Sequence, residues 1–147
     1  MKSALILSLV TLLSTTSLAQ KSTGGRATFY SPSVGLGSCG ETHADSDLVV
    51  AAPSNMMPGA CGKTVMITNT GTGNGVGNTI SAEVVDTCTG CGESDLDLST
   101  GAFEQLTNGD LGAGVATIDS QVYFRLDGSI NRILRIARLR RKAGHRK

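Results

Sequence analysis

Aromatic side chains and long apolar runs are both scarce in this sequence. Its 147 residues include no tryptophan, three phenylalanines and two tyrosines. A binding surface made of several stacked rings is therefore not expected, and binding that relies on such rings should be weak. After the N-terminal segment, no stretch approaches the roughly 20 consecutive apolar residues of a membrane-spanning helix. We therefore expect no membrane span in the rest of the chain.

The N-terminal segment has the three parts of a cleavable secretion signal. Lys2 precedes an apolar run from Ala4 to Leu13, and mostly small, polar residues lead from there to Ala19. The apolar run is about ten residues long, which is half of what a membrane span needs. We predict that residues 1–19 form a signal peptide, that cleavage leaves Gln20 first, and that the protein is secreted and extracellular.

Charge is divided unequally along the chain. Between Gln20 and Phe124 the sequence has three basic and eleven acidic side chains, whereas residues 125–147 carry nine basic and one acidic. The formal net charge of +1 therefore combines an acidic body with a basic tail, which should seek different partners. Helically spaced Ile130 and Ile133 could place the tail on an anionic surface, but its apolar face is incomplete, so we expect a disordered tail.

Short apolar or alternating runs, separated by glycine, proline and asparagine, indicate one mostly β domain. Ser99 or Thr100 should cap a short helix whose Phe103 and Leu106 face inward. The glycine-rich segment 69–78 should be a mobile loop at the tip of a hairpin. This spacing favours a barrel over a sandwich. The predicted strands are Gly25–Tyr30, Leu48–Ala52, Lys63–Thr68, Thr79–Val85 and Val115–Phe124.

Four cysteines in an exported chain indicate two disulfides, and the sequence leaves three pairings open. Cys88 and Cys91 form a CxxC motif, but the acidic segment that follows would raise a thiol pKa, which disfavours redox catalysis. Zinc would require a second close pair, whereas Cys39 and Cys61 stand 22 residues apart. We therefore expect no metal and no cofactor.

Five short motifs occur in an order that resembles the double-psi β-barrel of rare-lipoprotein-A-like, barwin-like and expansin-like proteins. The resemblance covers about Gly25 to Tyr123, and within it the chain looks most like the loosenins, small secreted single-barrel proteins of fungi. It implies an all-β, six-stranded barrel over residues 25–124 with one short helix, stapled by Cys39–Cys61 and Cys88–Cys91 disulfides. The motifs are Ala27–Tyr30, Ser38–Gly40, Ala60–Lys63, Val85–Cys88 and Leu96–Ser99.

The resemblance also implies a shallow groove that binds polysaccharide across one face of the barrel. Thr28 and Tyr30 would line it from the first strand, Asp86 from a strand end, and Asp97 would be the carboxylate on which wall-loosening activity depends in relatives. On the residues alone, Asp97 could equally cap the helix and Asp86 tie a turn. Tyr30 could equally be a packed barrel residue.

Two carboxylates beside a sugar can act as acid and base or can hold its hydroxyls. Endoglucanases that share this barrel carry a further aspartate just after the first strand, whereas Tyr30–Ser33 contains no acid. Relatives also commonly carry a tryptophan in the last strand, whereas this chain has Ser120 near that place. The missing ring argues against tight cellulose binding. The leading hypothesis is therefore a secreted monomer that binds cellulose or chitin without hydrolysing it.

Two alternative functions remain open from the sequence. One is an interaction protein, such as a cysteine-protease inhibitor or a secreted effector, which would bind its partner through the loops. The other is a lytic enzyme acting on peptidoglycan, which the missing acid disfavours. Neither nucleic acid nor a cofactor is an expected partner.

Overall fold

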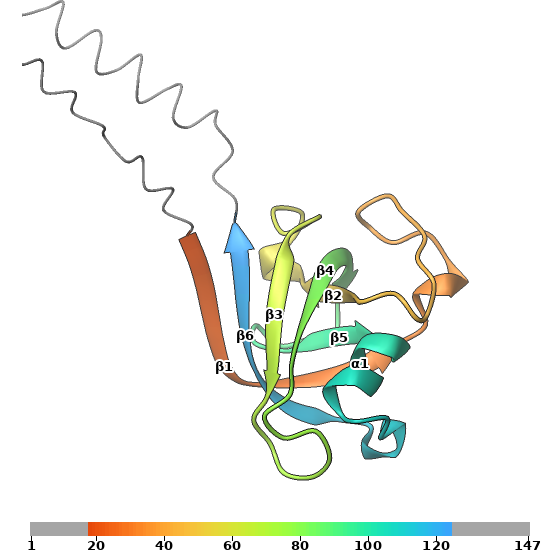
Figure 1. The fold of residues 1–147 in the computed structure, drawn as a ribbon. Coiled ribbons are helices and arrows are strands. Elements are labelled where there is room, and N and C mark those ends of the chain that lie inside the picture. Colours follow the sequence, from red (N-terminus) through yellow and green to blue (C-terminus); the bar gives the residue numbers. More distant parts are fainter. Residues whose placement is uncertain (1–17, 125–147) are drawn as a thin grey trace, which may run out of the picture. The chain divides into compact units, whose positions relative to one another are not determined.

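The structure, a computed structural model, describes residues 18–124. In this range six strands close a barrel in the order β1-β5-β2-β4-β3-β6 (Figure 1). The predicted signal peptide, apart from its last two residues, and the basic tail lie outside the described residues. The elements are β1 (Leu18–Tyr30), β2 (Val49–Pro53), β3 (Thr64–Asn69), β4 (Thr79–Cys88), β5 (Leu96–Ser99), α1 (Thr100–Leu106) and β6 (Ala116–Phe124), with short 3-10 turns at Pro32–Val34, Ser54–Met56 and Leu111–Ala113.

Two of the strand pairs are parallel and the others are antiparallel. β1 runs parallel to β5 and β2 runs parallel to β4. Parallel neighbours require long crossover connections, so the chain passes across the barrel twice. This arrangement confirms the predicted six-stranded double-psi β-barrel with one short helix. The structure also contains both expected disulfides, Cys39–Cys61 and Cys88–Cys91.

The core follows the predicted alternation of side chains. Buried and exposed residues alternate along β3 and β6, which each turn one face inward, whereas all of β2 is buried. The predicted helix is confirmed: the Ser99 hydroxyl accepts a hydrogen bond from the Ala102 N–H, 3.2 Å away, and Phe103 and Leu106 are buried. Since the Phe103 ring lies 4.9 Å from that of Phe29, α1 is packed onto β1. No helix among residues 18–124 is long and apolar enough to cross a membrane.

The first strand begins earlier than predicted. It starts at Leu18 instead of Gly25 and pairs with β6, with Gln20 opposite Val122. A register shift between Ser22 and Gly25 interrupts the ladder. The two adjacent glycines, which resemble a strand terminator in sequence, here accommodate a bulge in a continuous strand.

The glycine-rich segment 69–78, which was predicted to be a mobile loop, contacts the C-terminal end of α1. The Asn69 and Asn78 side chains donate hydrogen bonds to the Leu106 carbonyl, each at 3.4 Å, and satisfy a helix end. Gly75 adopts a φ of +77°, and a Cβ atom there would lie 2.2 Å from the Leu106 carbonyl oxygen. Glycine therefore serves close backbone contact at this position.

Candidate functional site

Four residues lie abreast across four neighbouring strands. Thr28 on β1 is in register with Asp97 on β5, Asp97 is in register with Ala51 on β2, and Ala51 is in register with Asp86 on β4. Residues that are in register across neighbouring strands point to the same face of a sheet. Because Ala51 has only a methyl group, no bulky side chain separates the Asp86 and Asp97 carboxylates along this row.

A bulge in β4 determines where Asp86 points. Val50 pairs with Val84, but the next residue of β2, Ala51, pairs with Asp86, so Val85 is the extra residue. In a regular strand Asp86 would share the face of Val84, which is fully buried in the core. The bulge reverses this orientation and turns Asp86 to the outer face.

The Asp97 carboxylate is held from the neighbouring strand. The Thr28 hydroxyl donates a hydrogen bond of 2.7 Å to Asp97 Oδ1. The helix-cap interpretation of Asp97 is wrong, because the residue that caps α1 is Ser99. Asp97 is therefore oriented by β1, on the same outer face as Thr28.

The Asp86 carboxylate is bound by a loop that is itself attached to the barrel. Asp86 Oδ1 accepts hydrogen bonds from the backbone N–H groups of Ser38 at 2.8 Å and Thr87 at 2.7 Å. The Cys39 N–H donates to the Val85 carbonyl at 3.1 Å, and the disulfide to Cys61 ties the same loop to the barrel. Asp86 thus does tie a turn, and among the described residues no donor reaches its second oxygen.

Tyr30 lies near both carboxylates. Burial raises the pKa of its phenol to about 12, with smaller contributions from the charges of Asp86 and Asp97. The hydroxyl is buried, and no other described residue gives it a hydrogen-bond partner. Tyr30 follows Thr28 by two residues and so faces the same side of β1. The structure therefore brings all four predicted groove residues to one face.

Sequence reasoning missed one carboxylate close to this face. Asp45 lies in the loop before β2, and its Oδ1 accepts a hydrogen bond of 3.1 Å from the Ser33 N–H. This contact, with further hydrogen bonds from Ser33 and Ser31, lowers the pKa of Asp45. The fold thus brings an ionised acid to the stretch after β1 that has none in sequence. No local motif marks Asp45, because the contact depends on how the loop folds back.

The described residues offer no metal site. No group of three or more histidine, cysteine, aspartate or glutamate side chains between residues 18 and 124 is arranged to hold an ion. The site residues therefore supply carboxylate acceptors, a phenol and a hydroxyl. Such groups can bind the hydroxyls of a neutral ligand.

Known proteins similar to this chain include an allergen, an expansin, a papain inhibitor and a cerato-platanin. No family model matches the chain. The allergen Asp f 7 of Aspergillus fumigatus is 42% identical over 95 residues, which cover 61% of this chain and 32% of that protein. An aspartate-to-asparagine mutant of Clavibacter michiganensis expansin, solved in complex with cellohexaose, is 35% identical, with a TM-score of 0.56, over 72% of this chain and 51% of that one. The chain thus spans about a third of the allergen and about half of the expansin.

Two further solved structures match nearly the whole of their own length. Cerato-platanin 3 from M. perniciosa, at 18% identity and a TM-score of 0.50 over 74% of this chain and 96% of that one, supports the fold alone. The Streptomyces papain inhibitor is 31% identical, with a TM-score of 0.56, over 70% of this chain and 94% of the inhibitor. On this coverage, and on the barrel order described above, the chain belongs to the expansin-like double-psi β-barrel family.

Proposed function

We propose that the protein is secreted and binds cell-wall polysaccharide, such as cellulose or chitin, in the groove formed by Thr28, Tyr30, Asp86 and Asp97, without hydrolysing it. The observation that carries this proposal is the row of two carboxylates, Asp97 on β5 and Asp86 on β4, with only Ala51 of β2 between them. The charges of both contribute to the raised pKa of Tyr30. The related expansin was solved with cellohexaose, which supports a glucan as ligand.

The groove offers complementary hydrogen-bonding groups to a sugar. The Asp86 and Asp97 carboxylates accept hydrogen bonds, whereas the Tyr30 phenol, which its raised pKa keeps protonated, can donate one when its buried hydroxyl turns to the ligand. Thr28 uses its hydroxyl proton to fix Asp97. Each such hydrogen bond contributes about 0.5–1.5 kcal/mol net, so binding through a few of them is weak. A weak binder of this kind would loosen packed chains by competing for the hydrogen bonds between them.

Hydrolysis is not part of the proposal. Glycoside hydrolysis requires one carboxyl group to act as acid while a second acts as base or nucleophile. Residues 30–33 hold no acid, and the carboxylate of Asp45, which lies beside them, is engaged by hydrogen bonds from Ser33 and Ser31 that hold its loop. Binding without bond cleavage therefore fits this arrangement best.

Retention on insoluble cellulose and chitin tests the groove. We expect the wild-type protein to be retained weakly and Asp97→Asn to be retained about 2- to 10-fold less, since it loses an ionic acceptor. Asp119→Asn is the matched control, because it makes the same change on β6, which lies outside the row. Equal retention of Asp97→Asn and Asp119→Asn would refute the groove, and release of soluble sugar would refute the non-hydrolytic part.

A second candidate function, inhibition of a papain-like protease, is favoured by one loop. Val34 and Leu36 are 86% and 73% exposed, although both are apolar. Their loop is anchored by the Ser38 and Cys39 contacts to β4 and by the Cys39–Cys61 disulfide. A rigid loop with apolar side chains loses little entropy when it enters an apolar cleft. The similarity to the Streptomyces papain inhibitor supports this kind of partner.

Inhibition of papain tests the second candidate separately from the groove. We expect the wild-type protein to inhibit at micromolar concentration and the double variant Val34→Ser, Leu36→Ser to lose inhibition by about tenfold or more. Val76→Ser is the control, because Val76 is 52% exposed in a different loop. Absence of inhibition by the wild-type protein, or equal loss in the control, would refute this role, whereas Asp97→Asn should leave inhibition unchanged.

A further inference from the structure

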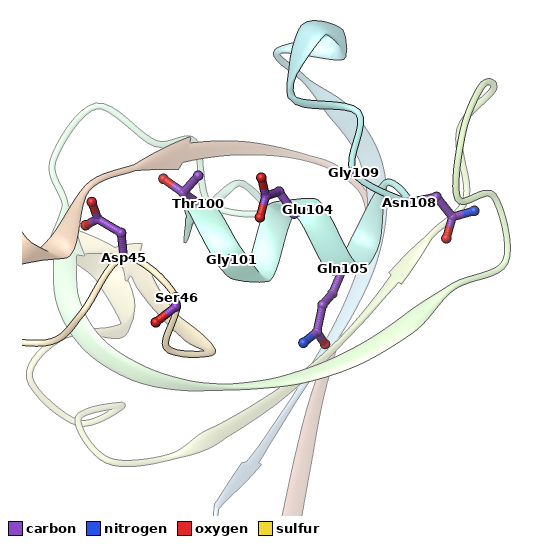
Figure 2. A pocket seen from close by; sticks show the side chains of 8 residues that line it. All are labelled: Asp45, Ser46, Thr100, Gly101, Glu104, Gln105, Asn108 and Gly109. Atoms are coloured by element: carbon purple, nitrogen blue, oxygen red, sulfur yellow. The ribbon is translucent and has the colours of Figure 1, made fainter.

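A hollow lies on the outer side of α1. It has a volume of about 540 Å³, which is within the range of small-ligand sites. Figure 2 shows the side chains that line it, from the loop before β2, from α1 and from the turn after α1. These residues are Asp45, Ser46, Thr100, Gly101, Glu104, Gln105, Asn108 and Gly109.

Hydrogen bonds fix the first wall of this cavity. The Gly101 N–H donates to the Asp45 carbonyl at 2.8 Å, and a Cβ atom at Gly101 would lie 2.8 Å from the Ser46 carbonyl oxygen. Glycine at the start of α1 therefore lets the loop lie directly against the helix. The Asp45 carboxylate is tied in turn to Ser33.

The opposite wall is fixed by the packed loop 69–78. Asn108 has a φ of +53° and Gly109 a φ of +83°, so the chain turns sharply after α1. The Asn78 amide donates a hydrogen bond of 2.9 Å to Asn108 Oδ1 and holds this turn. Hydrogen bonds therefore tie both ends of the cavity to neighbouring loops.

One residue that lines the cavity, Thr100, connects it to the end of β1. Tyr30 of β1 is in register with Ser99 of β5, and Thr100 follows directly. The Thr100 hydroxyl donates to the Tyr30 carbonyl at 3.4 Å. The lining of the cavity therefore begins at the residue that follows the partner of Tyr30 on β5.

The lining is polar and carries negative charge. It includes two carboxylates, Asp45 and Glu104, and no lysine or arginine. Within the part of the chain that the structure describes, no hydrogen bond engages the side chains of Ser46, Glu104 or Gln105, which leaves their polar atoms available to a ligand. Eleven acidic against three basic side chains between Gln20 and Phe124 add a negative field.

We propose that this cavity is a saccharide subsite that takes an amino sugar with a free ammonium group, as in deacetylated chitin. Hydroxyl and amide groups on the lining suit the sugar hydroxyls, and Asp45 and Glu104 pair with the ammonium group. The inference rests on the proposed function, because the cavity selects among glycans that the groove binds. A neutral glucan offers these carboxylates only hydroxyl groups and no positive charge, and an acidic glycan is repelled by them.

Soluble oligosaccharides of equal length test the subsite in the full protein. Glucosamine, N-acetylglucosamine and glucose hexamers are titrated calorimetrically at mildly acidic pH and low salt. We expect the glucosamine hexamer to bind about 2- to 5-fold more tightly than the other two for each ammonium–carboxylate pair, since exposed pairs contribute about 0.2–1 kcal/mol. High salt should remove this preference.

A charge-matched pair of variants separates the cavity from the overall charge. Glu104→Gln should abolish most of the preference for the glucosamine hexamer and leave binding of the glucose hexamer unchanged. Glu83→Gln removes the same charge from an exposed residue of β4 and should keep the preference. Equal preferences in both variants, or no preference in the wild-type protein, would overturn the subsite.

Asp97→Asn distinguishes failure of the subsite from failure of the groove. Loss of glucose-hexamer binding in Asp97→Asn, with an unchanged preference in Glu104→Gln, would leave the groove standing and overturn the cavity. Unchanged glucose-hexamer binding in Asp97→Asn, with reduced glucosamine binding in Glu104→Gln, would support the cavity and refute the groove.

Discussion

Replacing Tyr30 by phenylalanine should weaken polysaccharide binding without destabilising the fold. The Tyr30 hydroxyl is buried, near Asp86 and Asp97, and no described residue bonds to it. A buried polar group without a partner costs about 1–3 kcal/mol. Phenylalanine keeps the ring and removes this cost, so we expect the free energy of unfolding to stay equal or to rise by about 1 kcal/mol.

Polysaccharide binding by Tyr30→Phe should weaken, although its free energy of unfolding stays equal or rises. In the proposed groove the Tyr30 side chain turns its buried, unbonded hydroxyl toward the bound sugar and is the donor among acceptors. This hydrogen bond contributes about 0.5–1.5 kcal/mol. Tyr30→Phe should therefore be retained on cellulose or chitin about 2- to 12-fold less than the wild-type protein. Most point mutations destabilise, so a variant that is as stable but binds less would separate the two effects.

Urea unfolding followed by circular dichroism, together with the retention assay, measures both quantities. Tyr123→Phe is the control, because the Tyr123 hydroxyl donates instead to the Met66 sulfur, 3.1 Å away, at an exposed position. A loss of more than about 1 kcal/mol in Tyr30→Phe would show that the hydroxyl already has a partner in the folded protein. That result, or unchanged retention, would refute the role of Tyr30 as the groove's donor.

Three further predictions concern pH and the disulfides. Burial raises the Tyr30 pKa from 10.0 to about 12, so the free energy of unfolding does not depend on this group's ionisation below pH 10 and falls as the pH rises toward 12. Alkaline unfolding of Tyr30→Phe should lose this slope, and an identical slope would contradict the assignment. Arg26 holds the pKa of Asp95 below its ordinary value of 3.8. The pair therefore stabilises the fold above pH 3.8, and this stabilisation is lost as the pH falls further. Acid unfolding of Arg26→Gln should begin at higher pH than that of the wild-type protein, and an unchanged midpoint would argue against the pair. Removal of Cys39–Cys61, which spans 22 residues, should cost about 3 kcal/mol and removal of Cys88–Cys91, which spans 3, under about 2; equal losses in urea unfolding would contradict the loop-entropy argument.

The sequence predicts the strands whose two faces differ. β3 and β6 each have one face on the core and one in solvent, so apolar and polar residues alternate along them and reveal both strand and orientation. β5 has only four residues, which is too short for a period to be detected, and it was expected only through the family resemblance. The first half of β1 is polar and carries a bulge, so its pairing with β6 leaves no apolar pattern.

The orientation of the groove residues depends on contacts that spacing does not encode. Thr28 and Asp97 are 69 residues apart and meet because β1 and β5 are parallel neighbours. Asp86 faces outward only because Val85 is an extra residue in the ladder. A strand of regular pairing would give the same sequence the opposite orientation.

Asp45 shows why an acid that is absent from a motif can still be present at a site. The motif position after β1 holds only Tyr30, Ser31, Pro32 and Ser33, and sequence comparison at that position finds no carboxylate. The chain nevertheless folds Asp45 onto Ser33 from a loop twelve residues further on, and Gly101 lets that loop rest on α1. The same acid lines the neighbouring cavity, where it faces ligand space without a cation among the lining residues. Asp45 comes from a loop instead of a strand, so its neighbours differ from those of a strand residue. Hydrogen bonds from Ser33 and Ser31 lower its pKa and favour the ionised form, which attracts a cationic sugar.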